Sequence, residues 1–339
     1  MRAALLYRAR DLRIGQVPDP VPGPGEALLK VRAVGICGSD LHYYLDGCIG
    51  TAQVQDPFIM GHEFAAEVVE GGLLPPGTLV AVDPAQPCGT CEWCHTGHHN
   101  LCPKVRFVGS PPYSGALTEY ITAPPENLFP VPAHFDAATT ALLEPLGVAI
   151  HALDLARLKP MESVAVLGAG SIGLLLLQVA RQCGAGQLFA IDPINYRAEA
   201  ARKLGADGVA GTYEAILDWT KGRGADVVLE ATNSPLGPQH AAEAVRIGGR
   251  VVLVGIPEGD RFTLNASLVR RKGLTIKLSR RMGHVYSRAI QMVQSKRVQL
   301  APIATHHFGL EDTPEAFALQ AEYRDGVLKS VIYPWGGER

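Results

Sequence analysis

The chain has 339 residues, of which 47% are hydrophobic and 19% are charged, a composition typical of a globular protein of one or two domains. Its 31 basic and 33 acidic residues give a formal net charge of -2, so it lacks the basic excess that attracts nucleic acid or anionic membranes. The N-terminal residues lack the apolar core of a secretory signal, and no run is apolar for long enough to span a bilayer. We therefore expect a cytoplasmic protein that binds neither nucleic acid nor membranes.

Residues 1–130 predict a β-rich region. Short apolar runs alternate there with glycine and proline, a pattern typical of a compact antiparallel sheet. The runs that we expect to form strands span residues 2–7, 26–36, 64–71, 78–84 and 116–124.

From about residue 160 the pattern changes to short apolar runs that alternate with helical patterns. Alternating β and α units predict a doubly wound parallel sheet whose strands are buried on both faces. After about residue 285 the pattern is mixed again, so the sequence predicts two domains of an α/β protein. The expected strands of this half span 164–168, 188–193, 226–232, 250–256 and 327–334, and two expected helices span 171–185 and 196–206.

A nucleotide-binding turn is predicted at residues 168–173, where GAGSIG matches G-x-G-x-x-G between an expected strand and an expected helix. Such glycines allow a pyrophosphate to approach the N-terminus of the helix closely. Asp192 ends the next expected strand, where its carboxylate can accept hydrogen bonds from the adenosine ribose. A 2′-phosphate there would be repelled by about a few kcal/mol at an effective dielectric constant of ~20. We therefore predict NAD, a preference that the nearby Arg197 would soften.

Four of the seven cysteines crowd into one loop, in the pattern C-x2-C-x2-C-x7-C. Four thiolates complete a closed tetrahedral zinc site without a position for water, so this site is expected to be structural. The ligands are Cys88, Cys91, Cys94 and Cys102. They leave no vacancy for the histidines of the same loop, His95, His98 and His99, which we expect to be solvated. We expect Cys183, on the predicted 171–185 helix, to be a buried apolar thiol.

A second group of potential ligands is spread along the chain. Cys37, His62, Glu63 and Glu144 offer one thiolate, one imidazole and one or two carboxylates. Such a mixed set is typical of an open, catalytic zinc site that retains a position for water or substrate. No local spacing brings these residues together, and each of them has an ordinary structural role as an alternative.

The order of these motifs resembles that of the zinc-containing medium-chain dehydrogenases, and within them the sorbitol (polyol) dehydrogenases. CGSDLHYYLDGCIG, GHE, the cysteine-rich loop, FVGSPPYSG, EPLGVAIHA, GAGSIG with Asp192, and VLVGI carry the resemblance, which covers essentially the whole chain. It implies a GroES-like β-rich catalytic domain at 1–146, with the cysteine-rich loop at 86–103. It further implies a Rossmann NAD-binding domain at 147–281, and a return to the catalytic domain at 282–339. Two zinc ions per chain, NAD and a homotetramer are expected with it.

The resemblance also implies roles for individual residues. Cys37, His62 and Glu63 would bind the catalytic zinc, and Glu144 would either hold the water there or exchange with Glu63 as a ligand. Ser39 and His42 would lie on the proton path, and Tyr43, Glu144 and Arg280 would contact the polyol hydroxyls. The residues expected to line NAD are Gly168, Gly170, Ser171, Ile172, Gly173, Asp192, Arg197, Val254, Gly255, Ile256, Leu278 and Ser279.

The resemblance predicts an oxidoreductase that moves a hydride between a secondary alcohol, such as sorbitol or xylitol, and NAD. Arg281 stands where polyol dehydrogenases often carry an aromatic residue, so it is a further candidate substrate contact. Two adjacent arginines suit a phosphorylated or carboxylated sugar alcohol, because guanidinium pairs well with such groups. The alternatives are therefore a threonine or sugar-alcohol-phosphate dehydrogenase of the same family and, outside enzymes, an NAD-binding sensor on the same scaffold.

Overall fold

The computed structural model describes residues 1–55 and 57–336. The chain divides into two compact units. The first comprises Met1–Glu144, Tyr286–Gln294 and Leu300–Arg339, and the second comprises Pro145–Val285 and Ser295–Gln299. The chain thus leaves the first unit near the start of α4 (Leu143–Ala156) and returns to it at α10 (Tyr286–Gln294).

The first unit is built on a mainly antiparallel sheet, as predicted. Its strands follow the order β12-β8-β7-β3-β20-β19, and β11 also pairs with β3. The pair β19 and β20 is parallel, and α11 (Thr313–Ala321) provides the crossover that a parallel pair needs. The strands are β3 (Ala27–Gly35), β7 (Glu63–Gly71), β8 (Leu79–Val82), β11 (Tyr120–Ala123), β12 (Leu128–Pro130), β19 (Ala304–Gly309) and β20 (Lys329–Tyr333).

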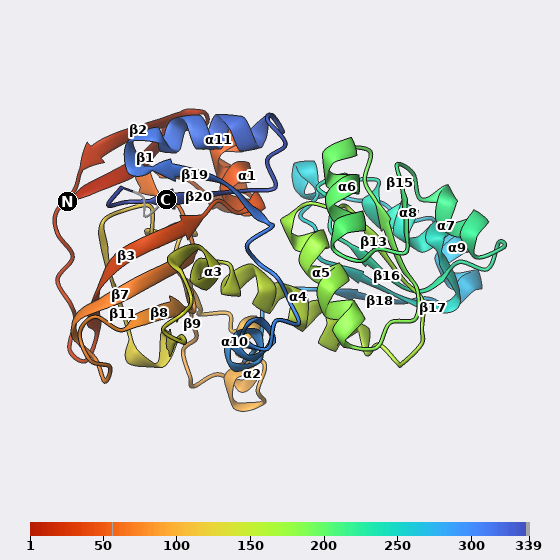
Figure 1. Cartoon of the computed structure of the whole chain (residues 1–339), viewed down its shortest axis with the longest axis horizontal. Coiled ribbons are helices and arrows are strands. Elements are labelled where there is room, and N and C mark those ends of the chain that lie inside the picture. The colour runs from red at the N-terminus through yellow and green to blue at the C-terminus, as the bar shows by residue number, and fades with distance from the viewer. Residues whose placement is uncertain (56, 337–339) are drawn as a thin grey trace. The chain divides into compact units, whose positions relative to one another are not determined.

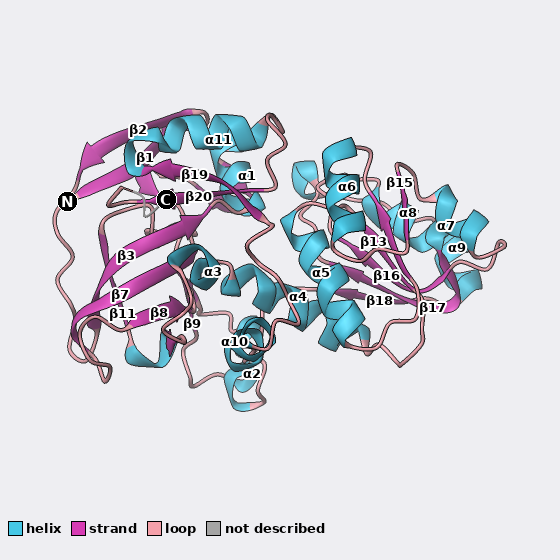
Figure 2. Ribbon diagram, in the orientation of Figure 1, coloured by secondary structure: helices cyan, strands magenta, loops and turns pink. Residues whose placement is uncertain are grey.

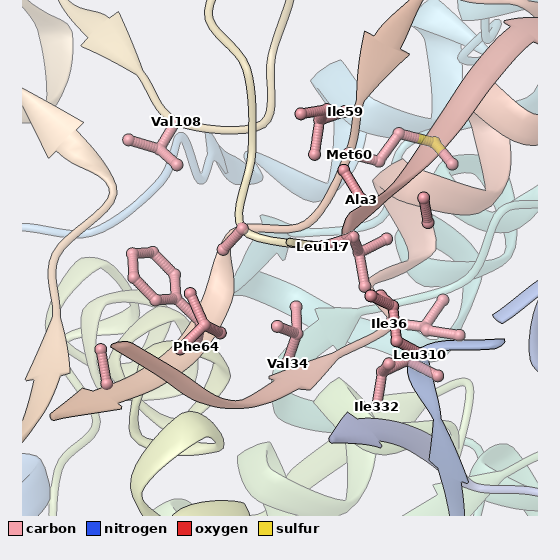
Figure 3. Close-up of a cluster of buried hydrophobic side chains, with 14 of the residues drawn as sticks. Ala3, Val34, Ile36, Ile59, Met60, Phe64, Val108, Leu117, Leu310 and Ile332 are labelled. Atoms are coloured by element: carbon pink, nitrogen blue, oxygen red, sulfur yellow. The ribbon is translucent and has the colours of Figure 1, made fainter. Parts of the chain in front are cut away.

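Alternation along these strands buries one face of the sheet. Residues of β3 are buried and half-buried in turn, as expected for a strand with one face in the core. Val34 of β3, Phe64 of β7 and Ile332 of β20 belong to one buried apolar cluster (Figure 3). The last strand of the chain therefore pairs with one of the first, and Figure 1 shows blue β20 near red-orange β3.

A further small sheet, several short strands and α-helices complete this unit. β1 (Arg2–Arg8) and β2 (Asp11–Gln16) form an antiparallel hairpin that β6 (Phe58–Ile59) extends. The remaining elements are α1 (Gly38–Asp46), β4 (Cys48–Ile49), β5 (Ala52–Gln53), β9 (Ala85–Gln86), α2 (Glu92–His95), β10 (Arg106–Phe107) and α3 (Ala137–Ala141).

The second unit is a doubly wound parallel sheet, as predicted. Its strand order is β15-β14-β13-β16-β17-β18, so the chain reverses its direction across the sheet between β13 and β16. All residues of β13, β14 and β16 are buried, which is expected for strands covered on both faces. The strands are β13 (Val164–Leu167), β14 (Leu188–Ile191), β15 (Gly208–Ala210), β16 (Ala225–Glu230), β17 (Val245–Leu253) and β18 (Thr275–Leu278).

Helices cover both faces of this parallel sheet (Figure 2). Contacts link α5 with α6, and α8 with both α7 and α9, so the helices form two separate groups. This is the arrangement that right-handed crossovers produce when the strand order reverses. The helices are α5 (Ser171–Gln182), α6 (Asn195–Lys203), α7 (Glu214–Trp219), α8 (Gly237–Ala244) and α9 (Ala266–Lys272). None of the helices in the described part of the chain is long and apolar enough to cross a membrane.

Candidate active site

Strand pairing in the first unit brings three potential metal ligands together. Cys37 is the N-cap residue of α1, two residues after the end of β3, and His62 and Glu63 stand where β7 begins. Gly35 pairs with Glu63 in the register of β3 and β7, so the two segments meet at one end of the sheet. One ligand atom of each residue lies within 4.8 Å of the others, and His62 and Glu63 are buried.

Asp40 orients two members of this group. Its carboxylate accepts a hydrogen bond from the backbone N–H of Cys37 at 3.0 Å, which completes a capping box at the start of α1. The other carboxylate oxygen lies 3.5 Å from His62 Nδ1 and accepts from the Gly61 N–H at 3.2 Å. A carboxylate behind a ligating histidine fixes the ring and directs its other nitrogen toward the metal.

Burial and charge act in opposite directions on His62. Burial lowers the pKa of its imidazole, but the nearby Asp40 and Cys37 together raise that pKa by more than burial lowers it. The net shift of the His62 pKa is therefore upward. The negative groups around the ring, Asp40 and Cys37, thus favour a positive charge beside them. One thiolate, one imidazole and one carboxylate in a buried, negative environment fit a zinc ion that keeps a position open for another ligand.

Lys329 is a buried partner of this group that the sequence did not reveal as a site residue. Its Nζ donates to both carboxylate oxygens of Glu63, at 2.8 and 2.7 Å, and to the carbonyl of Ile36 at 2.9 Å. The Ile36 carbonyl also accepts from Gln320 Nε2 at 2.9 Å. The available signal was a lysine inside the apolar run VLKSVIY, where an inward-facing charge needs a buried partner.

Glu144 lies near the group but is not among the three clustered ligands. Burial raises the pKa of its carboxyl group to about 8; His62 opposes this shift, and Glu63 adds to it. Glu144 therefore interacts electrostatically with both His62 and Glu63.

Three other residues predicted for the reaction, Ser39, His42 and Tyr43, lie on α1 and have different neighbours. Ser39 Oγ is 3.5 Å from His62 Nε2, whereas His42 Nδ1 lies 3.5 Å from Asp46 of the same helix. Tyr43 is buried, and its hydroxyl lies 3.0 Å from Ser110 Oγ. The sequence did not indicate Ser110, because this contact joins segments 67 residues apart.

The four cysteines of the loop between β9 and β10 converge as predicted from their spacing. Their four Sγ atoms all lie within 4.8 Å of one another, and Cys91 Sγ is 3.4 Å from Cys94 Sγ. Hydrogen bonds from Thr90 lower the pKa of the Cys88 thiol to about 6, while desolvation and the neighbouring sulfurs raise that of Cys94 to about 11. A divalent cation among the sulfurs would favour the thiolate at all four, so the set fits a closed zinc site.

Two predictions about side chains outside the ligand sets are wrong. His99 is buried rather than solvated, because it lies in a 3-10 turn whose residues His99 and Asn100 face inward. Cys183 is exposed rather than buried, because α5 ends at Gln182. Cys183 is the C-cap residue of that helix and lies outside its buried part.

The predicted nucleotide-binding turn joins β13 to α5 in the second unit. Gly168 has a φ of 88°, a left-handed conformation that favours glycine, and Gly170 is the N-cap residue of α5. Asp192 directly follows β14, and its carboxylate accepts from the N–H groups of Ala169 and Ile194 at 2.8 and 2.9 Å. Arg197 Nη1 lies 4.0 Å from Asp192.

A cavity of about 480 Å³ opens beside Asp192, between the ends of β14 and β15 and the start of α6. Its lining includes Asp192, Pro193, Tyr196, Arg202 and Gly211. The turn, the helix N-terminus and this cavity together offer places for a pyrophosphate and an adenosine, so the second unit fits a dinucleotide.

The remaining residues predicted for cofactor and substrate lie at the ends of β17 and β18 in the second unit. Val254 and Gly255 follow β17, and their N–H groups donate to the carbonyl of Glu230. Ile256 and Leu278 are exposed, and Ser279 N–H donates to Leu253. Arg280 is exposed, and Arg281 has a φ of 54°.

Both units of the chain match families of known proteins. Residues 23–133 match the alcohol dehydrogenase GroES-like domain, and residues 171–295 match the zinc-binding dehydrogenase family. Sorbitol dehydrogenase of Bacillus subtilis is 36% identical over 343 residues, which cover 98% of this chain and 97% of that protein. The chain belongs to the zinc-containing medium-chain dehydrogenases.

Further relatives within this family support the same assignment. D-xylulose reductase A of Aspergillus oryzae is 33% identical, with 88% of each chain covered. The solved structure of an alcohol dehydrogenase from Thermus sp. ATN1 superposes with a TM-score of 0.89 at 32% identity, over 98% of this chain and 99% of that one. The predicted family, its resemblance to sorbitol dehydrogenases and the fold class are thereby confirmed, and the protein is an enzyme rather than a noncatalytic sensor.

Proposed function

We propose that this dehydrogenase transfers a hydride between a secondary alcohol group of a polyol, such as sorbitol or xylitol, and NAD, giving the corresponding ketose. The observation that carries the proposal is the group of half-buried Cys37 with buried His62 and Glu63, whose ligand atoms lie within 4.8 Å of one another. Three protein ligands of this kind leave a position for a substrate oxygen, which a closed structural site does not offer.

In this proposal the three residues hold a catalytic zinc ion. When bound, zinc supplies Lewis acidity, which makes a substrate hydroxyl a far stronger acid at neutral pH. Asp40 keeps His62 oriented, and Lys329 holds the Glu63 carboxylate in place. We assign Glu144 to the open side of the site, as the partner of the substrate oxygen or as a ligand that exchanges with Glu63.

The proton of the substrate hydroxyl needs an acceptor. Ser39 is the proposed first acceptor, since its hydroxyl lies 3.5 Å from the imidazole of His62. His42, one turn further along α1 and half-buried, is the proposed exit toward solvent. Tyr43 is proposed to contact the polyol hydroxyls from the same helix.

Cofactor binding is assigned to the second unit. The N-terminus of α5 would receive the pyrophosphate, and Asp192 would receive the adenosine ribose and disfavour a 2′-phosphate. NAD supplies the hydride acceptor when bound. The further residues of the proposed site are Gly168, Gly170, Ser171, Ile172, Gly173, Arg197, Val254, Gly255, Ile256, Leu278 and Ser279.

Arg280 and Arg281 favour a second candidate substrate. Two adjacent guanidinium groups suit a phosphate or carboxylate, so a phosphorylated sugar alcohol competes with a neutral polyol in this proposal. Rates with sorbitol, xylitol, threonine and galactitol-1-phosphate, each with NAD and with NADP, separate these possibilities. If the enzyme prefers galactitol-1-phosphate and Arg281→Gln abolishes that preference, the proposed substrate becomes a phosphorylated sugar alcohol instead of a neutral polyol.

The decisive test combines metal content with turnover and cofactor binding. Wild-type protein is expected to hold two zinc ions per chain, and Cys37→Ser or His62→Ala to abolish turnover while NADH still binds. Cys183→Ser, an exposed cysteine outside both ligand sets, is the matched control and should retain activity. Full turnover in both ligand variants would refute the catalytic assignment. Light scattering would test the proposed homotetramer.

A further inference from the structure

A buried carboxyl group lies at the point of the parallel sheet where the strand order reverses. Glu230 is the last residue of β16, its side chain is buried, and it pairs in register with Leu167, the last residue of β13. Gly168, the first glycine of the nucleotide-binding turn, comes directly after Leu167 in the chain. In open α/β sheets, ligands bind in the crevice at the carboxyl ends of strands beside such a reversal.

Glu230 binds two neighbouring segments: its side chain binds Thr232, two residues further on, and its backbone carbonyl binds the residues that follow β17. One oxygen of its carboxyl group accepts from the Thr232 N–H at 2.8 Å and from the Thr232 hydroxyl at 2.5 Å. Its backbone carbonyl accepts from the N–H groups of Val254 and Gly255 at 2.8 and 3.1 Å. Burial raises the pKa of Glu230, and the hydrogen bonds from Thr232 oppose that shift.

The segment Ala231–Thr232 packs closely against two glycines, Gly168 and Gly255. A Cβ atom at Gly168 would lie 2.7 Å from the Ala231 carbonyl oxygen and 3.0 Å from the Thr232 methyl group. A Cβ atom at Gly255 would overlap the Thr232 carbonyl. A shift of Thr232 would therefore be transmitted to both glycines, because close-packed backbone segments move together.

We propose that Glu230 is a positioning residue for the dinucleotide cofactor: it fixes Thr232, and Thr232 in turn fixes Gly168 and Gly255 at the edge of the crevice. The inference rests on the proposed function, since it presumes that the crevice binds a dinucleotide. Glu230 does not need to touch the cofactor. Its effect is on the backbone that must approach the pyrophosphate closely.

Three variants in the full-length, zinc-loaded enzyme test the proposal. Glu230→Ala leaves the N–H and the hydroxyl of the half-buried Thr232 without their carboxylate acceptor, and about tenfold weaker NADH binding is expected. Glu230→Gln keeps a carbonyl oxygen at the same place and should bind NADH within about twofold of wild type. Thr232→Val removes the hydroxyl that donates to Glu230 and that accepts from the Ser234 N–H, but it keeps the Thr232 N–H bond to Glu230. Its NADH affinity should fall between those of the other two variants.

The matched control is Asp226→Asn, which changes a carboxylate near the other end of the same strand. Asp226 is held by Ser163, Arg223 and Arg246, away from the turn. This variant is expected to lower the thermal midpoint without changing the NADH dissociation constant. Glu230→Ala, by contrast, should raise KM for NAD and keep kcat at saturating NAD, with both zinc ions retained.

The readouts are NADH fluorescence titration, KM and kcat for NAD, zinc content and thermal unfolding. An unchanged NADH dissociation constant in Glu230→Ala would overturn the proposal, and so would a loss of kcat and stability with KM unchanged. If Glu230→Ala does not fold, Thr232→Val decides on the same criteria. A wild-type enzyme that fails to bind NADH would instead refute the proposed function itself.

Discussion

Replacing Lys329 with methionine would remove a buried ammonium group that contacts both carboxylate oxygens of Glu63, at 2.7 and 2.8 Å. The side chains of Lys329 and Glu63 are 2% and 1% exposed, so water cannot take over the lost interaction. Removing one partner of such a pair leaves an uncompensated buried charge, which costs ~3–5 kcal/mol. At ~2–4 °C per kcal/mol for a domain of this size, the thermal midpoint should fall by roughly 6–20 °C.

Zinc should reduce this loss, because a cation beside Glu63 replaces part of the charge that Lys329 supplied. We therefore expect the free energy of unfolding of Lys329→Met to fall more in zinc-stripped protein than in zinc-loaded protein. Urea unfolding followed by tryptophan fluorescence, at fixed zinc concentrations, measures both values. Lys104→Met, at an exposed position, is the control and should change stability by less than ~0.5 kcal/mol.

A double-mutant cycle isolates the pair itself. Glu63→Gln removes the charge of the partner, so Lys329→Met should cost less in that background, by a coupling energy of ~1–3 kcal/mol. The reasoning is refuted if Lys329→Met costs less than ~1 kcal/mol in zinc-free protein, or if the two changes are additive.

Three further outcomes follow from other parts of the molecule. Cys88→Ser should lower the zinc content by about one ion per chain and lower the thermal midpoint, since the loop depends on its metal; two retained zinc ions would contradict this. Asp192→Asn should reduce the preference for NAD over NADP in kcat/KM by about tenfold; wild-type enzyme that uses both equally would contradict the assignment. Although burial opposes the shift, hydrogen bonds from Arg223, Ser163 and Arg246 lower the pKa of Asp226. Its contribution to stability is therefore complete above the unfolded pKa, near 4, and is lost as the pH falls through the lower folded value. The stability difference between wild type and Asp226→Asn should thus be constant from about pH 7 to 5 and shrink below about pH 4, and a difference that grows in acid would be inconsistent.

The sequence determined the features whose parts lie close together along the chain. The four cysteines converge because a 15-residue loop holds them, and their spacing already fits one ion. The turn at 168–173 was predictable because a buried strand, three glycines and a helix follow one another directly. Short apolar runs bounded by glycine and proline likewise predicted β3 and β7, and short apolar runs that alternate with helical patterns predicted the parallel strands, since strands buried on both faces are apolar throughout.

The tertiary structure alone decided which distant residues meet. Glu63 and Lys329 are separated by 266 positions and meet because β20 pairs with β3 beside β7. The burial of His99 and the place of Glu230 against the nucleotide-binding turn depend likewise on how segments pack. No local pattern encodes such contacts, because they follow from strand order and register, which the burial of the whole apolar surface selects.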